Sequence, residues 1–407
     1  MKVLVCSDQL PNKSHSTVTY MNLVLTKHLI NKGHDVFFAA INSNKKFFLD
    51  RNKIDKNIKN SFFFKNFYWR QKKYNYFLLI VKRIFRYNLA DFFPRLKNLK
   101  VFEKVLKWSR PDLIIIWGSH DIIFGFNMIN INLNAAIVAD SPDLTVKYKR
   151  TFLNENFFIK IIFYIYFYFI YSIKIKLLIK NNLKKVKKIF FTSNYEDKKF
   201  KSLGLKNSQF IRNLVPDLGF AKNLKKNNKL KKFKILMFGN MHGTATLAGL
   251  KYFNDKIFHK LTSTGEDFEV SICGKVSKKA LEILTISREK NVFLRGFVKD
   301  LKKAISQADV VLVPTPIVLG IRVRIVYAWT IGACVIAHEA NQRGMNDLID
   351  GYNCILGKNS DDLVSKIILI KNNFFLKKKI IINARKYYEK NFNNDSWFSK
   401  FSKELNL

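Results

Sequence analysis

The stretch that decides the fold runs from Val311 to Gly351 and reads VLVPTPIVLGIRVRIVYAWTIGACVIAHEANQRGMNDLIDG. An apolar strand ends in a Pro-Thr-Pro turn, a glycine turn follows at Gly320, and a helical segment then leads to Gly332 and a second apolar strand. A helix that starts directly after a strand and a glycine turn directs its free N–H groups and its positive end at one place. The pattern therefore predicts a pocket for an anion.

Two basic residues flank this predicted pocket, Arg322 and Arg324. A guanidinium group can bind phosphate oxygens through two parallel hydrogen bonds, so a pair of arginines suits a diphosphate. An ordinary βαβ unit with solvated arginines would give the same local pattern. Both interpretations stay open on this stretch alone.

The composition supports two domains and an anionic partner. The chain has 407 residues, 48% of them hydrophobic, which is enough for two domains with real cores. It holds 72 Lys and Arg against 30 Asp and Glu, a formal net charge of +42 that attracts lipid headgroups, nucleotides or nucleic acid. Phe, Tyr, Ile and Asn are abundant too, and a genome rich in A and T is an alternative source of part of the lysine. The sequence carries no helix-turn-helix, zinc or RNA-recognition signature, so nucleic acid is the weakest of these three partners.

The cysteines and the N-terminus indicate a cytoplasmic protein. Cys6, Cys273, Cys334 and Cys354 are scattered and form no CxxC pair, and we predict free thiols in a reducing compartment. The first residues, MKVLVCSDQ, form a short apolar strand followed by polar residues, without the apolar region of a secretory signal.

Strands and helices alternate along the chain, which predicts an α/β fold of two doubly wound parallel-sheet, Rossmann-like domains. We predict an N-terminal domain at 1–218, a linker at 219–232 and a C-terminal domain at 233–385. For a final helix at 386–407, packing back on the N-terminal domain is one option. Strands are predicted at Val3–Cys6, Val36–Ala40, Leu113–Trp117, Ala135–Ala139, Ile189–Thr192, Ile235–Phe238, Phe268–Cys273, Val292–Leu294, Val310–Val313 and Ala333–Ala337. Helices are predicted at Ser16–Lys32, Leu247–Leu261, Ala280–Ser287 and Leu301–Ala308.

Two segments do not fit a plain sheet domain. Ser61–Arg110 combines many Lys and Arg residues with many aromatic ones, and Ile161–Ile173 is an uncharged apolar run flanked by lysines. The second is shorter than the roughly 20 residues that a spanning helix needs. Both suit a membrane surface, with aromatic rings at headgroup depth and cations on anionic lipid. A solvated insertion and a buried core helix are the respective alternatives.

Several motifs together resemble one enzyme family. They are MKVLVCSDQ with HLINKGHDVFFAA, FFTSNYEDKKFKSLGL with IRNLVPD, FKILMFGNMHG, FLRGFVKDLKKAISQADVVLVPTP, and GIRVRIVYAWTIGACVIAHEANQRGMNDLIDGYNCIL. In this order they resemble the group 1, family 4-like glycosyltransferases of the GT-B fold. The resemblance implies two Rossmann-like domains facing across a cleft and sugar transfer from a nucleotide-diphosphate donor. It also implies retention of the anomeric configuration and no metal or other cofactor.

The resemblance places the donor in the C-terminal domain. Backbone amides of Gly320 and Ile321 would bind the diphosphate, Arg322 and Arg324 would balance its charge, and Arg295, Gly296 and Phe297 would hold the base. The other implied donor contacts are Gly239, Asn240, Gly243, Gly274, Lys275, Tyr327 and Asp347. For Asp347 a helix-capping role is an equal alternative.

The sequence departs from the family at two positions. The family often has two glutamates here, one facing the sugar and one bonding the ribose, where this chain has Leu319 and Tyr327. Some members with the same arginine variant also lack them. The Tyr327 hydroxyl is a candidate for the ribose contact.

Candidate acid and base residues follow strands of the N-terminal domain. His120, Asp140 and Asp143 come directly after apolar strands, where side chains of this fold face the ligand cleft. Helix capping is the alternative for His120 and its neighbour Asp121. Dispersed histidines and the lack of an HxH or DxD motif at a strand end predict no metal site.

The sequence thus predicts a glycosyltransferase that moves a sugar from a nucleotide-sugar onto a cell-surface glycan or lipid-linked acceptor. We expect it in the cytoplasm, on the inner face of the plasma membrane. Two alternatives stay open: a binding protein that kept the fold and lost catalysis, and a nucleotide-sugar epimerase of the same fold.

Overall fold

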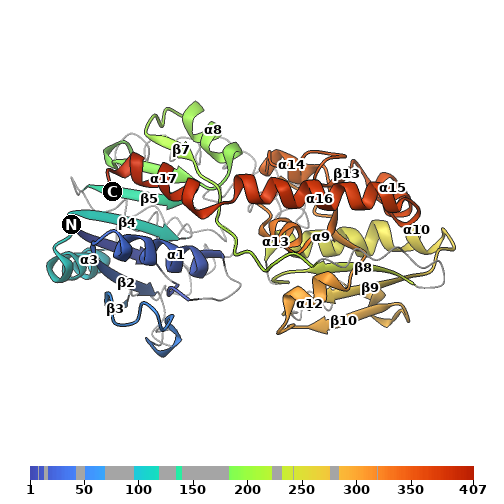
Figure 1. Cartoon of the computed structure of the whole chain (residues 1–407), viewed down its shortest axis with the longest axis horizontal. Helices are drawn as coiled ribbons and strands as arrows, with labels where there is room; N and C mark the ends of the chain where they lie inside the picture. Colours follow the sequence, from blue (N-terminus) through green and yellow to red (C-terminus); the bar gives the residue numbers. More distant parts are fainter. Residues whose placement is uncertain are drawn as a thin grey trace, which may run out of the picture. The chain divides into compact units, whose positions relative to one another are not determined.

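The computed structural model describes residues 1–7, 9–12, 17–42, 51–68, 96–118, 134–139, 183–221, 232–241, 243–275, 284–318 and 320–407. The chain divides into two compact units (Figure 1). Unit 1 comprises Met1–Leu214 and Asn394–Leu407, and unit 2 comprises Val215–Asn393. Each unit contains one parallel sheet with helices on both faces, so the predicted α/β class is confirmed.

Unit 1 contains a seven-stranded sheet in the order β3-β2-β1-β4-β5-β6-β7. Its strands are β1 (Lys2–Ser7), β2 (Asp35–Asn42), β3 (Phe63–Tyr68), β4 (Leu113–Gly118), β5 (Ala135–Ala139), β6 (Lys188–Phe191) and β7 (Ser208–Phe210). Its described helices are α1 (Thr17–Asn31), η2 (Arg51–Lys53), α3 (Leu96–Ser109), η5 (Leu183–Lys185), α8 (Asn194–Ser202) and α17 (Asn394–Leu405). Sequential strands progress outward from β1 in both directions, which is the doubly wound order.

Alternating residues of each strand cover the two faces of this sheet. Val3 and Val5 of β1 face the core beneath α1 and α17, whereas Leu4 and Cys6 face the core beneath α3 and α8. The C-terminal helix α17 is therefore part of unit 1, and Figure 1 shows it beside the strands of that unit. It buries four large apolar side chains, and each contributes about 1.5–3 kcal/mol. They are Trp397, Phe398, Phe401 and Leu405.

The structure describes the two ends of the segment Ser61–Arg110. Its two described ends are part of the sheet domain, because β3 pairs with β2 and α3 covers the sheet. Phe62 and Phe102 are buried in the two cores, where they cannot reach a lipid headgroup. Strongly amphipathic aromatic segments fit a half-buried sheet edge as well as they fit a membrane surface. The middle of the segment and all of Ile161–Ile173 lie outside the described residues.

Unit 2 contains a six-stranded parallel sheet in the order β10-β9-β8-β11-β12-β13. Its strands are β8 (Phe233–Phe238), β9 (Phe268–Cys273), β10 (Val292–Gly296), β11 (Val310–Val313), β12 (Cys334–His338) and β13 (Ile355–Gly357). Its described helices are α9 (Thr244–Tyr252), the π-helix η6 (Phe253–Ile257), α10 (Phe258–Thr262), η7 (Thr285–Arg288), α12 (Leu301–Ser306), α13 (Val323–Ile331), α14 (Ala340–Gly344), α15 (Ser360–Asn372) and α16 (Phe374–Asn391). The strand order reverses between β8 and β11, and ligands of such sheets bind at the carboxyl ends of the strands at this switch point.

The helices of unit 2 also form two layers. Ile235 and Met237 of β8 pack in a core shared with η6, α10 and α15. Leu236 and Phe238 pack in the opposite core, which α13 fills with buried side chains such as Trp329. Of the predicted helix Ala280–Ser287 the structure describes residues 284–287, and the single 3-10 turn η7 begins within them.

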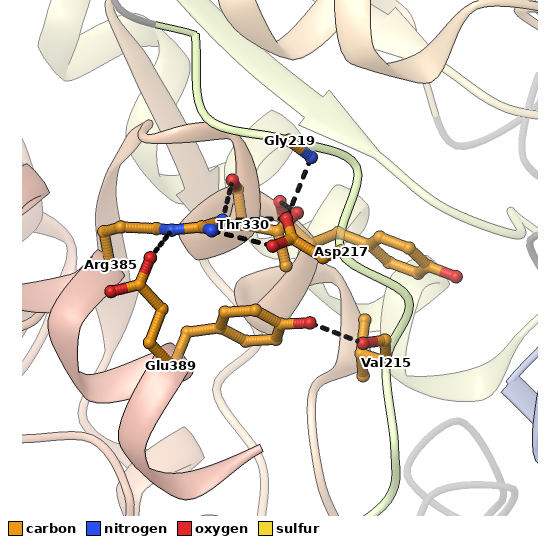
Figure 2. A network of polar contacts seen from close by, with 8 residues as sticks. Val215, Asp217, Gly219, Thr330, Arg385 and Glu389 are labelled. Carbon is orange, nitrogen blue, oxygen red and sulfur yellow. Dashed lines mark hydrogen bonds and ion pairs between the residues drawn. The ribbon is translucent and has the colours of Figure 1, made fainter. Parts of the chain in front are cut away.

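The boundary of unit 2 lies earlier in the chain than the predicted linker. Asp217, placed at the end of the predicted N-terminal domain, accepts two hydrogen bonds of 2.7 Å from the fork of Arg385 on α16 (Figure 2). The backbone carbonyl of Val215 accepts a bond of 2.8 Å from the hydroxyl of Tyr388, also on α16. These contacts fix the segment from Val215 onward to unit 2, and α16 itself continues to Asn391. Residues 222–231 of the predicted linker lie outside the described residues.

Candidate functional site

Two interlocked glycine turns form the carboxyl edge of the unit 2 sheet. Gly239 follows β8 with φ 136°, and Gly274 follows the neighbouring β9 with φ 147°, a backbone region that side chains other than hydrogen rarely adopt. A Cβ atom at Gly274 would lie 1.9 Å from the carbonyl oxygen of Gly239. The Gly274 amide donates to the carbonyl of Gly296 at the end of β10. Bare backbone therefore lines three adjacent strand ends, where a ligand can approach closely.

Arg324 extends from the first turn of α13 to this edge. Its Nη1 donates to Thr246 Oγ1 at 3.1 Å and its Nη2 donates to Thr315 Oγ1 at 2.8 Å. Thr246 is on α9, which follows β8, and Thr315 directly follows β11 by one proline. The guanidinium is thus held at the switch point between β8 and β11, close to Gly239.

The charge of Arg324 is not balanced within the part of the chain that the structure describes. Both hydrogen-bond partners are neutral hydroxyl groups, and burial lowers the pKa of Arg324 to about 10. The group still carries its proton at neutral pH. A desolvated cation without an anion is costly, so this arrangement favours the binding of an external anion.

Two helices of unit 2 direct their N-termini to the same edge without a side-chain cap. In α9 the N-cap position is Gly243, and in α13 it is Arg322, whose side chain makes no cap bond. By contrast, α12, α15 and α16 are each capped by an Asp or Asn side chain. The first amides of a helix lack intrahelical partners and carry partial positive charge, so α9 and α13 add to the attraction of an anion.

Arg322 makes its hydrogen bonds to protein oxygens, and its predicted donor contact stays a prediction. It is 7% exposed, and its Nε donates to Asn341 Oδ1 at 2.8 Å. Its two other nitrogens donate to the carbonyls of Ile317 and Gly320 in the loop that precedes α13. Asn341 in turn donates to three carbonyls, those of Val313, Thr315 and His338. Arg322 therefore holds the loop in shape, and its charge faces protein oxygens.

Two other predicted donor contacts are buried in unit 2. Tyr327 is 4% exposed and packs in the core beneath α13, which leaves it poorly placed for a ribose. Asp347 is also buried, and its carboxylate accepts a bond of 2.8 Å from the hydroxyl of Tyr387 on α16. This side-chain contact is not a helix cap, and the donor role of Asp347 stays a prediction.

The remaining predicted residues fall into two groups. Asn240, Gly243 and Lys275 lie on the glycine turns, with Asn240 and Lys275 exposed, and Gly320 and Ile321 lie in the loop before α13. Phe297 is 74% exposed and follows Gly296 at the end of β10, where the resemblance places the base. Leu319, His120, Asp140 and Asp143 lie outside the described residues.

Sequence reasoning missed Thr246, Thr315 and Asn341. A single hydroxyl or amide side chain has no periodicity or spacing that marks it as functional. The one available signal was the Pro-Thr-Pro turn, since a polar residue between two prolines at a strand end has a fixed direction. Among the described residues no group of three His, Cys, Asp or Glu side chains could hold a metal ion, and metal independence stays a prediction.

The comparisons with known proteins agree with this geometry. The family described as "Glycosyl transferases group 1" matches residues 232–373, which cover the unit 2 sheet. A search of curated proteins finds no match to the sequence. The predicted family is confirmed: residues 232–373 form a group 1 glycosyltransferase domain.

Solved structures resemble the whole chain. The crystal structure of Anabaena Alr3699/HepE in complex with UDP and glucose is 13% identical, with a TM-score of 0.63 and 100% of both chains covered. TarM, which has also been solved from S. aureus in complex with Fondaparinux, alpha-GlcNAc-glycerol and UDP, is 13% identical, with a TM-score of 0.67 over 100% of this chain and 99% of its own. The lipopolysaccharide outer core galactosyltransferase WaaB is 13% identical, with a TM-score of 0.59 over 100% of this chain and 99% of its own. The architecture is that of the GT-B glycosyltransferases, and the group 1 domain at residues 232–373 supports a transferase enzyme.

Proposed function

We propose that this glycosyltransferase binds a nucleotide-diphosphate-sugar at the carboxyl edge of the unit 2 sheet and transfers the sugar with retention of configuration. One observation carries the proposal: a half-buried arginine, Arg324, is held at the switch point by two neutral hydroxyls. The N-termini of α9 and α13, which have no side-chain cap, add partial positive charge at the same sheet edge. A diphosphate supplies the negative charge that Arg324 and these two helix ends favour.

The chemistry that this arrangement supports is stabilisation of the leaving group. The bond between the anomeric carbon and the terminal phosphate oxygen breaks, and its electron pair leaves with the nucleoside diphosphate. Arg324 and the two helix ends stabilise the developing charge, and fixed donors of this kind need no reorganisation during the reaction. The acceptor oxygen forms the new bond and loses its proton. His120, Asp140 and Asp143 are the proposed acid and base groups.

We propose UDP as the nucleotide and a cell-surface or lipid-linked glycan as the acceptor. The choice of UDP rests on the UDP bound to HepE and TarM. The choice of acceptor rests on WaaB, which is described as a lipopolysaccharide outer core galactosyltransferase. The exposed Phe297 at the end of β10 is the proposed surface for the base. Stacking of a base on an aromatic ring contributes about 1–3 kcal/mol.

We further propose that the protein works on the inner face of the plasma membrane. The net charge of +42 supports attraction to anionic lipid. Among the described residues, α16 carries the exposed Phe375 with the exposed Lys378 and Lys379 one turn further along, and Lys386 and Lys390 are exposed on the same helix. No helix in the described part of the chain is both long and apolar enough to cross a bilayer.

Sedimentation with phosphatidylglycerol and phosphatidylcholine vesicles tests the proposal. Binding only to the first supports it, and equal binding to both contradicts it.

The experiment for the enzymatic proposal is a donor screen. The purified protein is incubated with UDP-, GDP- and ADP-sugars and a glycan acceptor, and transfer and donor hydrolysis are measured. Turnover of one donor that is lost in Arg324→Met supports the proposal. Equal turnover by that variant overturns the role of the site.

A second candidate is a binding protein that has lost catalysis. Leu319 and Tyr327 stand where the family often has glutamates, and the burial of Tyr327 leaves it poorly placed to replace one of them. Tight donor binding without transfer or hydrolysis of any donor in the screen would favour this candidate. Interconversion of the sugar without release of nucleotide would favour the epimerase.

A further inference from the structure

Thr246 and Thr315 are the two acceptors that fix the guanidinium of Arg324, and neither was assigned a role by sequence. We propose that these two threonines are positioning residues for the diphosphate: they hold Arg324 in place with neutral groups and leave its charge for the ligand. This inference rests on the proposed function, because it concerns the same site.

The Thr315 hydroxyl connects three elements. Its oxygen accepts from Arg324 Nη2 at 2.8 Å, and its one proton is donated to the carbonyl of Ala245 at 3.1 Å. The strand end of β11, the first turn of α9 and the first turn of α13 are therefore joined at one atom. Since the proton is committed to Ala245, a lone pair of the oxygen faces the guanidinium.

Thr315 is completely buried and packs closely against α9. A Cβ atom at Gly249 would lie 2.8 Å from Thr315 Oγ1 and 3.3 Å from its backbone nitrogen. Glycine inside a helix costs about 1 kcal/mol relative to alanine. Gly249 is explained if α9 must approach Thr315 this closely. The packing of α9 therefore fixes the position of the Thr315 hydroxyl.

Neutral partners distinguish this arginine from a structural one. A carboxylate at either position would hold the guanidinium equally well and would raise its pKa, but it would also satisfy the charge. Burial instead lowers the pKa of Arg324, since the hydroxyls offer geometry without a negative charge. A diphosphate site requires a cation whose side chain is fixed in direction and whose charge is not already balanced by a carboxylate.

The test compares affinities for UDP and uridine by calorimetry. Thr315→Val removes the hydroxyl at constant volume, and we expect the affinity for UDP to fall about tenfold with little change for uridine, because hydrogen bonds to charged groups are stronger than average. Thr315→Ser should restore it. Thr246→Val, on the half-buried side of α9, should act in the same direction and tests the idea if the first variant does not fold. The matched control is Thr330→Val, a buried threonine of α13 whose hydroxyl bonds only a helix carbonyl in the described structure.

A second pair of variants tests the need for neutrality. Thr246→Asp places an anion beside Arg324, whereas Thr246→Asn is similar in size and uncharged. We expect the aspartate to reduce UDP affinity at least tenfold more than the asparagine does. Equal UDP affinity in all threonine variants, with loss in Arg324→Met, would overturn this inference and leave the proposed function standing. A wild-type protein that binds none of UDP, GDP and ADP would overturn the proposed function itself.

Discussion

Two arginines of unit 2, Arg385 and Arg324, are both held by hydrogen bonds but differ in what balances their charge. Arg385 lies between Asp217 and Glu389 and also donates to the carbonyl of Thr330 (Figure 2). Its carboxylate partners raise the pKa of Arg385, chiefly through the hydrogen bonds to Asp217. Burial lowers the pKa of Arg324, which has hydroxyl partners among the described residues.

We propose that this difference separates a cation that stabilises the fold from one that binds a ligand. Arg385 fixes the chain segment at Val215–Gly219 to α13 and α16, and its charge is satisfied within the protein. Arg324 adds little to stability, because its desolvation offsets its two hydrogen bonds. Proteins commonly retain such unfavourable groups where function needs them.

The largest effect is expected for Arg324→Met. The methionine keeps much of the length and removes the charge, so the developing charge on the diphosphate loses its main partner. We expect kcat/KM for the sugar donor to fall about 100-fold or more, which corresponds to roughly 3 kcal/mol. Steady-state kinetics with the donor found in the screen would measure it. A change below threefold would remove the distinction between the two arginines.

A smaller effect, on stability, is expected for Gly274→Ala. The added Cβ atom would meet the Gly239 carbonyl at a φ that disfavours side chains, so we expect the free energy of unfolding to fall by about 2–4 kcal/mol. Urea denaturation measures this. The control is Gly265→Ala, which has φ 70° and open space, and for which about 1 kcal/mol is expected. Equal losses in both would mean that the glycine turns at the site are not closely interlocked.

Arg385→Met should show the opposite profile to Arg324→Met. Loss of the bond to Asp217 frees the segment before β8, and partial exposure of the pair limits the cost to about 1–2 kcal/mol of unfolding free energy. UDP affinity should stay within twofold of wild type while the protein is folded. Denaturation and calorimetry on the same sample give both values. A large loss of UDP affinity would show that the two arginines are not functionally separate.

The smallest effect is expected in the pH dependence of the unfolding free energy, to which Asp217 contributes. Hydrogen bonds from Arg385 lower the pKa of Asp217 in the folded state. A carboxyl group of this kind stabilises the fold above its unfolded pKa, near 4, and the contribution is lost as pH falls through the folded value. The difference in stability between wild type and Asp217→Asn should therefore shrink as the pH is lowered from 6 to below about 4. A difference that is constant with pH would contradict the ion pair.

The sequence predicted most of the central strands but few of the edges. Ala135–Ala139, Phe268–Cys273 and Val310–Val313 were predicted at the bounds that the structure gives, because buried parallel strands are short apolar runs. The three-residue strands β7 and β13 were not predicted, and β3 lies in a segment for which a membrane surface was predicted. Edge strands of this kind are defined by their pairing partner, which local periodicity does not reveal.

The candidate site was predictable where backbone geometry defines it. Gly239, Gly274 and Arg324 lie together at one sheet edge, as the strand-turn-helix order requires. The separate fates of Arg322 and Arg324, two positions apart, depend on the Asn341 amide and on two threonines from distant elements. Such partners are set by tertiary packing, so no spacing in the sequence could have distinguished the two arginines.

The central claim is that Arg324 is a desolvated cation held for a diphosphate. Thermal unfolding of wild type and Arg324→Met, each without and with UDP, tests it most directly. The wild type should gain stability with UDP, by about 2.7 kcal/mol at 100 times its Kd. The variant should unfold at the same or a higher temperature without UDP and should show no gain. A variant that is clearly less stable alone, yet gains as much as the wild type, would contradict the claim.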